Sequence, residues 1–154
     1  MNYWLMKSEP DVYSIDDLKR DVHEIWDGVR NYQARNFLKS MELGDIAFFY
    51  HSNTKPPGIV GLMKVSDVMV VDPTQFDESN KYYDPKSTPD APRWHTVTVT
   101  YVETFENFLS LDQLKGSFEP EELQVVKRGN RLSVMPVDEA IAKRILNLAR
   151  GVQG

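Results

Sequence analysis

Residues suited to holding a planar ligand are concentrated between positions 25 and 45, in the segment IWDGVRNYQARNFLKSMELGD. Trp26 offers an aromatic face, and Asn31 and Arg35 offer amide and guanidinium donors a few residues later. The pair Asp27-Gly28 predicts a tight turn, because glycine accepts positive φ and aspartate can bond its own backbone. An indole held beside such donors is suited to binding a planar polar ligand.

Each of these residues also has a purely structural interpretation. Trp26 and Trp94 could be core residues, since large aromatic side chains are usually buried. Asn31 could cap the helix that follows it, and Arg35 and Lys39 could be solvated partners of nearby carboxylates. The segment therefore indicates a binding site only together with other residues at the ends of elements, where binding sites are usually built.

Catalytic chemistry is not favoured by any motif in the chain. The phosphate-binding loop, nucleophile elbow, zinc-protease and dinucleotide signatures are absent from the sequence. The three histidines are scattered and cysteine is missing, so we expect no metal site and no cofactor. An enzyme remains the less favoured alternative, with Glu9 as its candidate general base.

Capping residues predict four helices, which begin after Ser14, Asn31, Ser110 and Asp138. The second helix carries apolar residues at i, i+3, i+4 and i+7, and we expect Gly44 to follow its end. These helices are short, so they cannot form many of the crossovers that a parallel sheet requires.

Apolar runs predict strands at residues 2–6, 46–50, 59–71 and 132–135, of which 59–71 is one long strand or a bent pair, and alternation of residues predicts a half-buried strand at 94–101. Gly61 is expected to mark a bulge or a close approach of another segment, and Pro136 to stop the last strand. Residues 72–92 contain four prolines among polar residues and predict a long loop. The pattern predicts an α+β fold with a mainly antiparallel sheet that curls into a barrel.

Length and charge bound the remaining possibilities. The 154 residues predict one domain over positions 1–154. A net charge of −5 argues against a protein that coats nucleic acid non-specifically. The start of the chain is not typical of a signal peptide, and no apolar run has transmembrane length, so we expect a cytoplasmic protein without a membrane partner. The oligomeric state stays open, a monomer included.

Five motifs, YWLMKSEP, WDGVRNYQARNFL, GDIAFFYHSN, GIVGLMKV and RLSVMPV, together resemble the EVE domain family. This family belongs to the PUA-like superfamily, and the resemblance implies a small curled β-barrel flanked by helices. Relatives in the family are implicated in binding modified bases, so it also implies a nucleic-acid partner, DNA or RNA, that carries a modified cytosine or adenine.

The order of motifs is also similar to that of YTH domains, which bind methylated adenine in an aromatic cage. The similarity implies that Lys7-Ser8 and Trp26 lie beside the cage and Ser52-Asn53 at a neighbouring strand end. It implies Trp94 as a second aromatic wall.

The expected function is therefore a reader domain that holds a modified base in an aromatic-walled pocket. Trp26 would stack on the base, which contributes about 1 to 3 kcal/mol, and Ser8, Asn31 and Ser52 would contact its edge. We expect these four residues to share one concave pocket. The full predicted ligand-binding set is Lys7, Ser8, Glu9, Trp26, Arg30, Asn31, Arg35, Tyr50, Ser52, Asn53, Trp94, Arg131 and Ser133.

Within this set, Arg30, Arg35 or Arg131 would hold the adjacent phosphate. Two alternatives remain for the function: an enzyme acting on a modified nucleotide or RNA, and a non-catalytic protein-interaction domain. An enzyme would show a buried carboxylate with a raised pKa within reach of the ligand. An interaction domain would show tryptophans sealed in the core and an exposed apolar patch elsewhere.

Overall fold

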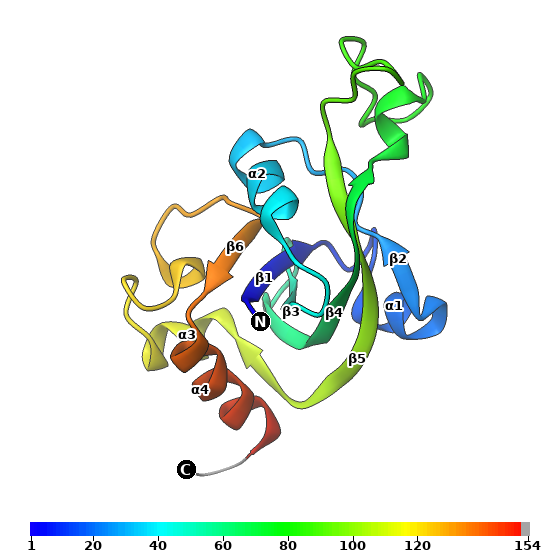
Figure 1. The fold of residues 1–154 in the computed structure, drawn as a ribbon. Coiled ribbons are helices and arrows are strands. Elements are labelled where there is room, and N and C mark those ends of the chain that lie inside the picture. The colour runs from blue at the N-terminus through cyan, green and yellow to red at the C-terminus, as the bar shows by residue number, and fades with distance from the viewer. Residues whose placement is uncertain (152–154) are drawn as a thin grey trace.

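The computed structural model describes residues 1–151 (Figure 1). Its strands are β1 (Tyr3–Ser8), β2 (His23–Ile25), β3 (Ile46–His51), β4 (Gly58–Val71), β5 (His95–Ser110) and β6 (Val134–Val137). Its α-helices are α1 (Ile15–Asp21), α2 (Tyr32–Ser40), α3 (Leu111–Ser117) and α4 (Glu139–Arg150). Two short 3₁₀ helices lie at Pro73–Phe76 and Gln124–Val126.

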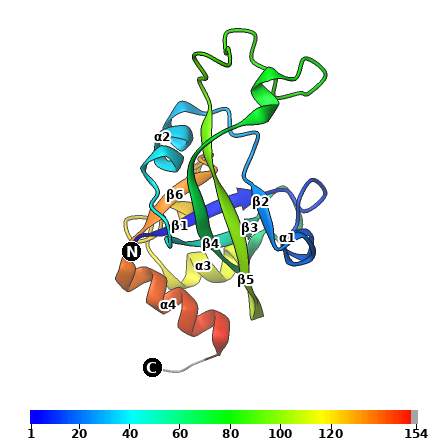
Figure 2. The ribbon, with the colours of Figure 1, turned by 45° about the vertical axis from the view of Figure 1, so that its right-hand side comes forward.

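All six strands belong to one sheet with the order β2-β5-β4-β3-β1-β6. Neighbouring strands are antiparallel except β1 and β3, which run parallel. The long strands β4 and β5 bend together and curl the sheet around its inner face (Figure 2). The structure confirms the predicted α+β fold with a mainly antiparallel sheet.

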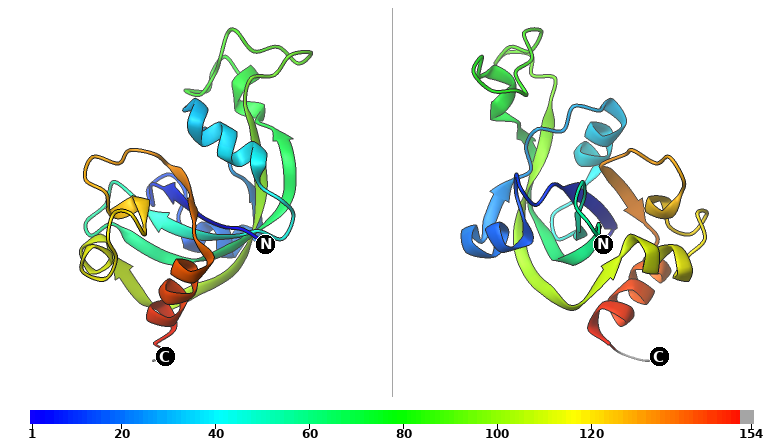
Figure 3. Two further views of the ribbon diagram at one scale, coloured as in Figure 1. Left: turned by 60° about the vertical axis from the view of Figure 1, so that its left-hand side comes forward. Right: turned by 180° about the vertical axis from the view of Figure 1, so that it is seen from behind.

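The curled sheet is open, and this corrects the expectation of a closed barrel. Within the described part of the chain, β2 and β6 are its two edges (Figure 3). These edge strands have three and four residues. Closing a barrel requires a continuous ladder between the first and last strands, and such short edge strands offer few backbone groups for it.

Apolar cores fill both faces of the sheet, because successive residues of a strand point to opposite sides. In β1, Leu5 belongs to the core that also contains Ile141 and Ile145 of α4. Its neighbour Trp4 belongs to the other core, which also contains Leu38 of α2. Helices α1 and α2 therefore cover one face, and α4 covers the other.

Helix starts agree with the predictions more closely than helix ends. Ser14 and Ser110 cap α1 and α3 through capping boxes, as predicted. Helix α2 ends at Ser40, before the expected position, with Met41 as its cap. Gly44 instead forms a turn at φ +87°, and its N–H donates to the Val65 carbonyl at 2.9 Å.

Strand boundaries contain the larger errors. Strand β6 continues through Pro136, which lies opposite Trp4, whereas the sequence predicts that this proline stops the strand. An edge strand tolerates proline because one of its sides needs no N–H donor. The three-residue strand β2 and the second half of β5 were missed, since neither carries a run of apolar residues. The bulge at Gly61 is confirmed by a register shift between β4 and β5.

The predicted loop after residue 71 is confirmed and connects β4 to β5 as a projection beyond the sheet (Figure 1). Asp72 begins it as the cap of the 3₁₀ helix Pro73–Phe76. Among residues 1–151, no helix has the length and apolar character needed to cross a membrane.

Candidate functional site

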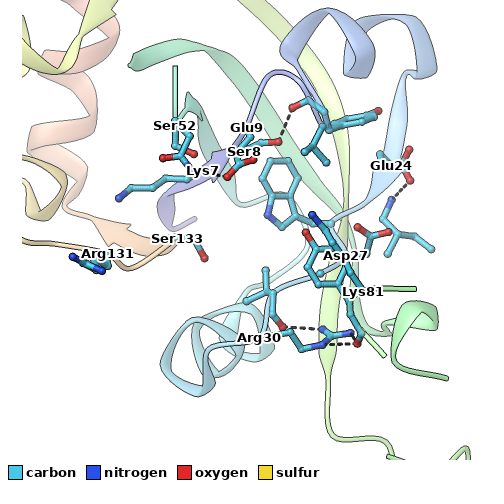
Figure 4. Close-up of a pocket in the computed structure, with 18 of the residues that line it drawn as sticks. Lys7, Ser8, Glu9, Glu24, Asp27, Arg30, Ser52, Lys81, Arg131 and Ser133 are labelled. Carbon is cyan, nitrogen blue, oxygen red and sulfur yellow. Dashed lines mark hydrogen bonds between the residues drawn. The ribbon is translucent and has the colours of Figure 1, made fainter. Parts of the chain in front are cut away.

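A groove of about 790 Å³ lies where the ends of β1 and β3 approach the segment after β2, the β4–β5 loop and the segment before β6 (Figure 4). The residues that line it include most of the predicted ligand-binding set: Lys7, Ser8, Glu9, Trp26, Arg30, Ser52, Asn53, Arg131 and Ser133. The fold thus brings together residues from distant parts of the chain.

Trp26 forms part of the groove wall, and it is also packed into the core. Its side chain is buried and meets Phe49 edge-on, with ring centroids 5.4 Å apart. Its backbone N–H donates to the Val97 carbonyl at 3.0 Å, and its carbonyl accepts from Thr96. Trp26 is therefore both a core residue and part of the groove wall, and these contacts hold its indole in place.

Tyr82 from the β4–β5 loop provides a second aromatic residue in the groove. Its ring lies so close to Gly28 that a Cβ at that glycine would be 2.5 Å away. Gly28 has the positive φ expected of it, +82°, but residues 26–30 form no regular turn. The sequence reasoning missed Tyr82 because it lies in a polar loop, where no periodicity predicts the orientation of a side chain.

Trp94 does not line this groove, so its assignment as the second wall is wrong. Its ring stacks on Tyr32 with centroids 5.0 Å apart and planes 20° from parallel. Its indole N–H donates to Asp84 at 2.8 Å. Trp94 directly precedes β5 and is buried where the β4–β5 loop returns to α2.

Arg30 lines the groove, but its guanidinium is fully occupied by the protein. Its side chain lies 5.0 Å from the Trp94 ring centroid and 5.6 Å from that of Tyr82. Its five N–H donors make five hydrogen bonds, to Val29 O, Asp72 Oδ2, Thr74 Oγ1 and, twice, Tyr82 O. Arg30 therefore has no free donor for phosphate and instead fastens the loop to the groove wall.

Asp72 is the buried carboxylate that organises this connection. One of its oxygens accepts from the Gly28 N–H at 2.9 Å and from Arg30 at 3.1 Å. The other accepts from the backbone N–H and the hydroxyl of Thr74. The sequence reasoning treated Asp72 only as the start of a loop.

Two serines join the ends of β1 and β3 beside the groove. The Ser52 N–H donates to the Ser8 carbonyl at 3.0 Å, and the Ser8 hydroxyl donates to the Tyr13 carbonyl at 2.6 Å. The Ser8 hydroxyl thus has a local backbone partner, and a lone pair of its oxygen stays available to a ligand. Ser133 follows on the other side, where its carbonyl accepts from the Lys7 N–H at 2.8 Å.

Lys7 is a half-buried cation of the groove. Its ammonium lies 5.8 Å from the Tyr50 ring centroid, and burial lowers the pKa of Lys7. Tyr50 itself is a core residue beneath the groove, and burial raises its pKa to about 12. Within residues 1–151, the Lys7 ammonium forms no ion pair. It can therefore donate to a bound ligand.

The groove also contains carboxylates. Glu9 is exposed and accepts a 2.5 Å hydrogen bond from Asn53, so it lacks the burial expected of a general base. Asp27, which the sequence reasoning used only as a turn residue, lines the groove. The side chain of Asp27 is exposed, yet desolvation, followed by the nearby charges of Asp72 and Glu24, raises the pKa of Asp27.

Asn31, Arg35, Tyr50 and Trp94 are the predicted residues that lie outside the lining. Asn31 caps α2 by accepting from the Ala34 N–H at 2.9 Å, as its structural interpretation states. The prediction that Ser8, Trp26, Asn31 and Ser52 share one pocket is therefore wrong for Asn31. Arg35 points toward the start of β5, where it donates to the Arg93 carbonyl at 3.0 Å.

The groove can therefore hold a planar group against aromatic side chains and offer it both donors and acceptors. Cations come from Lys7, Lys81 and Arg131, and acceptors from the serines and carboxylates. Residues 1–151 contain no group of three or more histidines, aspartates or glutamates placed to hold a metal ion.

Comparisons with known proteins identify the family and the fold. The EVE domain family model matches residues 2–148. Mouse thymocyte nuclear protein 1 is 46% identical over 165 residues, covering 96% of this chain and 73% of that protein. The crystal structure of human THYN1 in complex with DNA containing 5-methylcytosine is 42% identical and covers 97% of this chain and 98% of its own, with a TM-score of 0.88.

A more distant likeness concerns the fold alone. The Pho92 YTH domain, solved in complex with m6A, is 17% identical and has a TM-score of 0.56, over 97% of this chain and 83% of its own. The similarity to YTH domains expected from the order of motifs is thus found at the level of the fold.

Proposed function

The chain belongs to the EVE domain family, and from this premise we propose that it is a reader domain that binds a modified nucleobase of a nucleic acid in the groove beside Trp26. The observation that carries the proposal is the groove itself, which combines aromatic residues with polar groups from separate segments. The human relative solved with DNA containing 5-methylcytosine supports it.

The size and composition of the groove suit a single nucleotide flipped out of its stack. Pockets for small ligands typically enclose about 300–1,000 Å³, and this groove has about 790 Å³. A flipped base is held by stacking on aromatic side chains and by hydrogen bonds to its edge. Trp26 and Tyr82 supply the aromatic surfaces, and Ser52, Ser133 and Lys7 supply polar groups for the edge and sugar.

The overall charge of the protein is compatible with this mode of binding. At −5, the net charge opposes extended contact with a polyanion. Capture of one nucleotide needs only local cations, and Lys7, Lys81 and Arg131 are present at the groove. We propose 5-methylcytosine in DNA as the first ligand, with a modified adenine as the next, in a cytoplasmic protein.

The experiment is a fluorescence titration with two DNA strands that differ only in one 5-methyl group on cytosine. The wild-type protein should bind the methylated strand more tightly. Tyr82→Ala removes one aromatic surface and should weaken that binding by about 1 to 3 kcal/mol, the contribution of one base-stacking side chain.

Tyr83→Ala is the matched control, because Tyr83 is the adjacent tyrosine of the same loop and does not line the groove. It should leave affinity and methyl preference unchanged. A second pair of strands differs only in one methyl group on adenine. If the wild-type protein binds both members of each pair with equal affinity, the reader function is excluded. Equal effects of the two variants would exclude Tyr82 as a contact.

An enzyme acting on a modified nucleotide is the second candidate, and Asp27 is the observation that favours it. This carboxyl lines the groove, and desolvation and the nearby charges of Asp72 and Glu24 raise its pKa, which suits an acid catalyst, although its side chain is exposed like that of Glu9. Mass spectrometry of a methylated oligonucleotide after incubation with the protein tests this candidate. Conversion that Asp27→Asn abolishes would establish catalysis, whereas an unchanged oligonucleotide would leave binding as the function.

A further inference from the structure

A second surface, whose cations form no ion pair within the described chain, lies on α2 and at the start of β5, outside the groove. We call it the α2 surface and define it by Tyr32, Arg35, Lys39, Arg93 and His95. The Arg35 guanidinium lies 4.8 Å from the Tyr32 ring centroid and donates to the Arg93 carbonyl. The Arg93 side chain reaches the Tyr32 hydroxyl at 3.5 Å. These contacts make the surface continuous.

The positive charge of the α2 surface is not neutralised by ion pairs. Within the described chain, Arg35, Lys39 and Arg93 form no salt bridge. Arg35 bonds the neutral amide of Asn36, and Lys39 is exposed. The Asp84 carboxylate accepts a hydrogen bond from the Trp94 indole N–H, which lowers the pKa of Asp84, and the charge of Arg93 helps to lower it. The three cations of the α2 surface therefore form no ion pair in the described chain.

His95 reports the same local excess of positive charge. Burial, and then the charges of Lys39 and Arg35, lower the pKa of His95. Its buried Nδ1 has no hydrogen-bond partner among the described residues. Lys39 and Arg35 lie close enough to His95 to disfavour its protonated form. They therefore create a local positive potential on a protein whose net charge is −5.

The α2 surface is joined to the groove through two stacked side chains. Arg30 lines the groove and lies over the Trp94 ring. On Trp94 stacks Tyr32, which is 52% exposed and belongs to the α2 surface. The groove and the surface are thus neighbouring parts of one end of the molecule, where α2 and the β4–β5 loop lie (Figure 1).

We propose that the α2 surface binds the phosphate backbone of the nucleic-acid strand next to the nucleotide held in the groove. The inference rests on the proposed function for the identity of the strand. Guanidinium and ammonium groups are the usual ligands of phosphate, and such contacts position a strand without selecting its sequence. Affinity and selectivity therefore reside in different parts of the molecule: the surface adds affinity, and the groove selects the base.

The test compares two double variants with equal net charge. Lys39→Gln combined with Arg93→Gln removes two cations of the α2 surface, whose side chains make few internal contacts. Lys115→Gln combined with Lys143→Gln removes two exposed cations from α3 and α4, which lie at the other end of the molecule (Figure 1). Affinity for the methylated and unmethylated strands is measured at 50 and 200 mM salt.

Each phosphate contact contributes about threefold to the loss of affinity between these salt concentrations. We expect the α2-surface variant to bind both strands more weakly than the wild type at low salt. The ratio of its affinities at 50 and 200 mM salt should be about tenfold smaller than that of the wild type, because two contacts are lost. The ratio of affinities for the two strands should not change. The control variant should keep the salt sensitivity of the wild type.

The outcomes separate this inference from the proposed function. If the wild type prefers the methylated strand and both double variants show the same salt sensitivity, the α2 surface is not a contact and the reader function stands. If methylation has no effect but the α2-surface variant alone loses salt sensitivity, the surface stands and the reader function fails. Poly-glutamate that competes as well as the strand would overturn the inference in favour of an acidic protein partner.

Discussion

Replacing Asp72 with asparagine should damage both stability and the groove, because this carboxylate connects the groove wall to the β4–β5 loop. Its side chain is 2% exposed and accepts hydrogen bonds from Gly28, Arg30 and Thr74. Asparagine has almost the same shape, but its NH₂ group must face either the Gly28 and Arg30 donors or the Thr74 donors. In either orientation, one set of N–H or O–H donors faces the NH₂ group and loses its acceptor.

The magnitude follows from the burial of the two charges. Removing one partner of a buried ion pair costs about 3–5 kcal/mol. The Arg30 side chain is 21% exposed, so solvent compensates part of its lost counterion. We therefore expect Asp72→Asn to lower the free energy of unfolding by about 3 kcal/mol. For a domain of this length, that corresponds to a fall in Tm of roughly 6–12 °C.

Thermal and urea unfolding, followed by tryptophan fluorescence, measure this effect. Asp77→Asn is the matched control, because Asp77 lies in the same loop and accepts from Ser79 but is exposed. It should cost less than about 1 kcal/mol. If Asp72→Asn proves as mild as Asp77→Asn, the carboxylate does not hold the wall, and the account of Arg30 as a structural clamp is wrong.

Two further substitutions probe the groove and its support. Gly28→Ala should destabilise the protein more than Gly44→Ala and should weaken base binding. Both glycines have positive φ, which costs an alanine about 1–2 kcal/mol. Only at Gly28 would the new methyl group also meet the Tyr82 ring. His51 accepts from a backbone N–H of α1, and burial lowers its pKa. The unfolded chain therefore binds the proton more readily, so stability should fall as pH decreases below about 6.5. His51→Gln should reduce this slope in urea unfolding between pH 7.5 and 5.5, whereas replacing the exposed His23 should not.

The sequence by itself determined the features that depend on residues within one turn of each other. The capping boxes at Ser14 and Ser110 and the positive φ at Gly28 are confirmed in the structure. So is the buried strand β3. Local backbone preferences and hydrophobic periodicity act over a few residues, and they leave a pattern that can be recognised without the fold. The resemblance to the EVE domain extended this knowledge to the sheet as a whole.

Only the tertiary structure decided which residues form the groove. Trp26 and Trp94 have similar burial, yet only Trp26 lines the groove. Tyr82 lies there because its loop is pinned by Arg30 and Asp72, which are separated by 42 positions in the chain. Contacts over such distances depend on how the strands pair and where the loop returns. They leave no periodic trace in either segment, so local reasoning could neither find Tyr82 nor exclude Trp94.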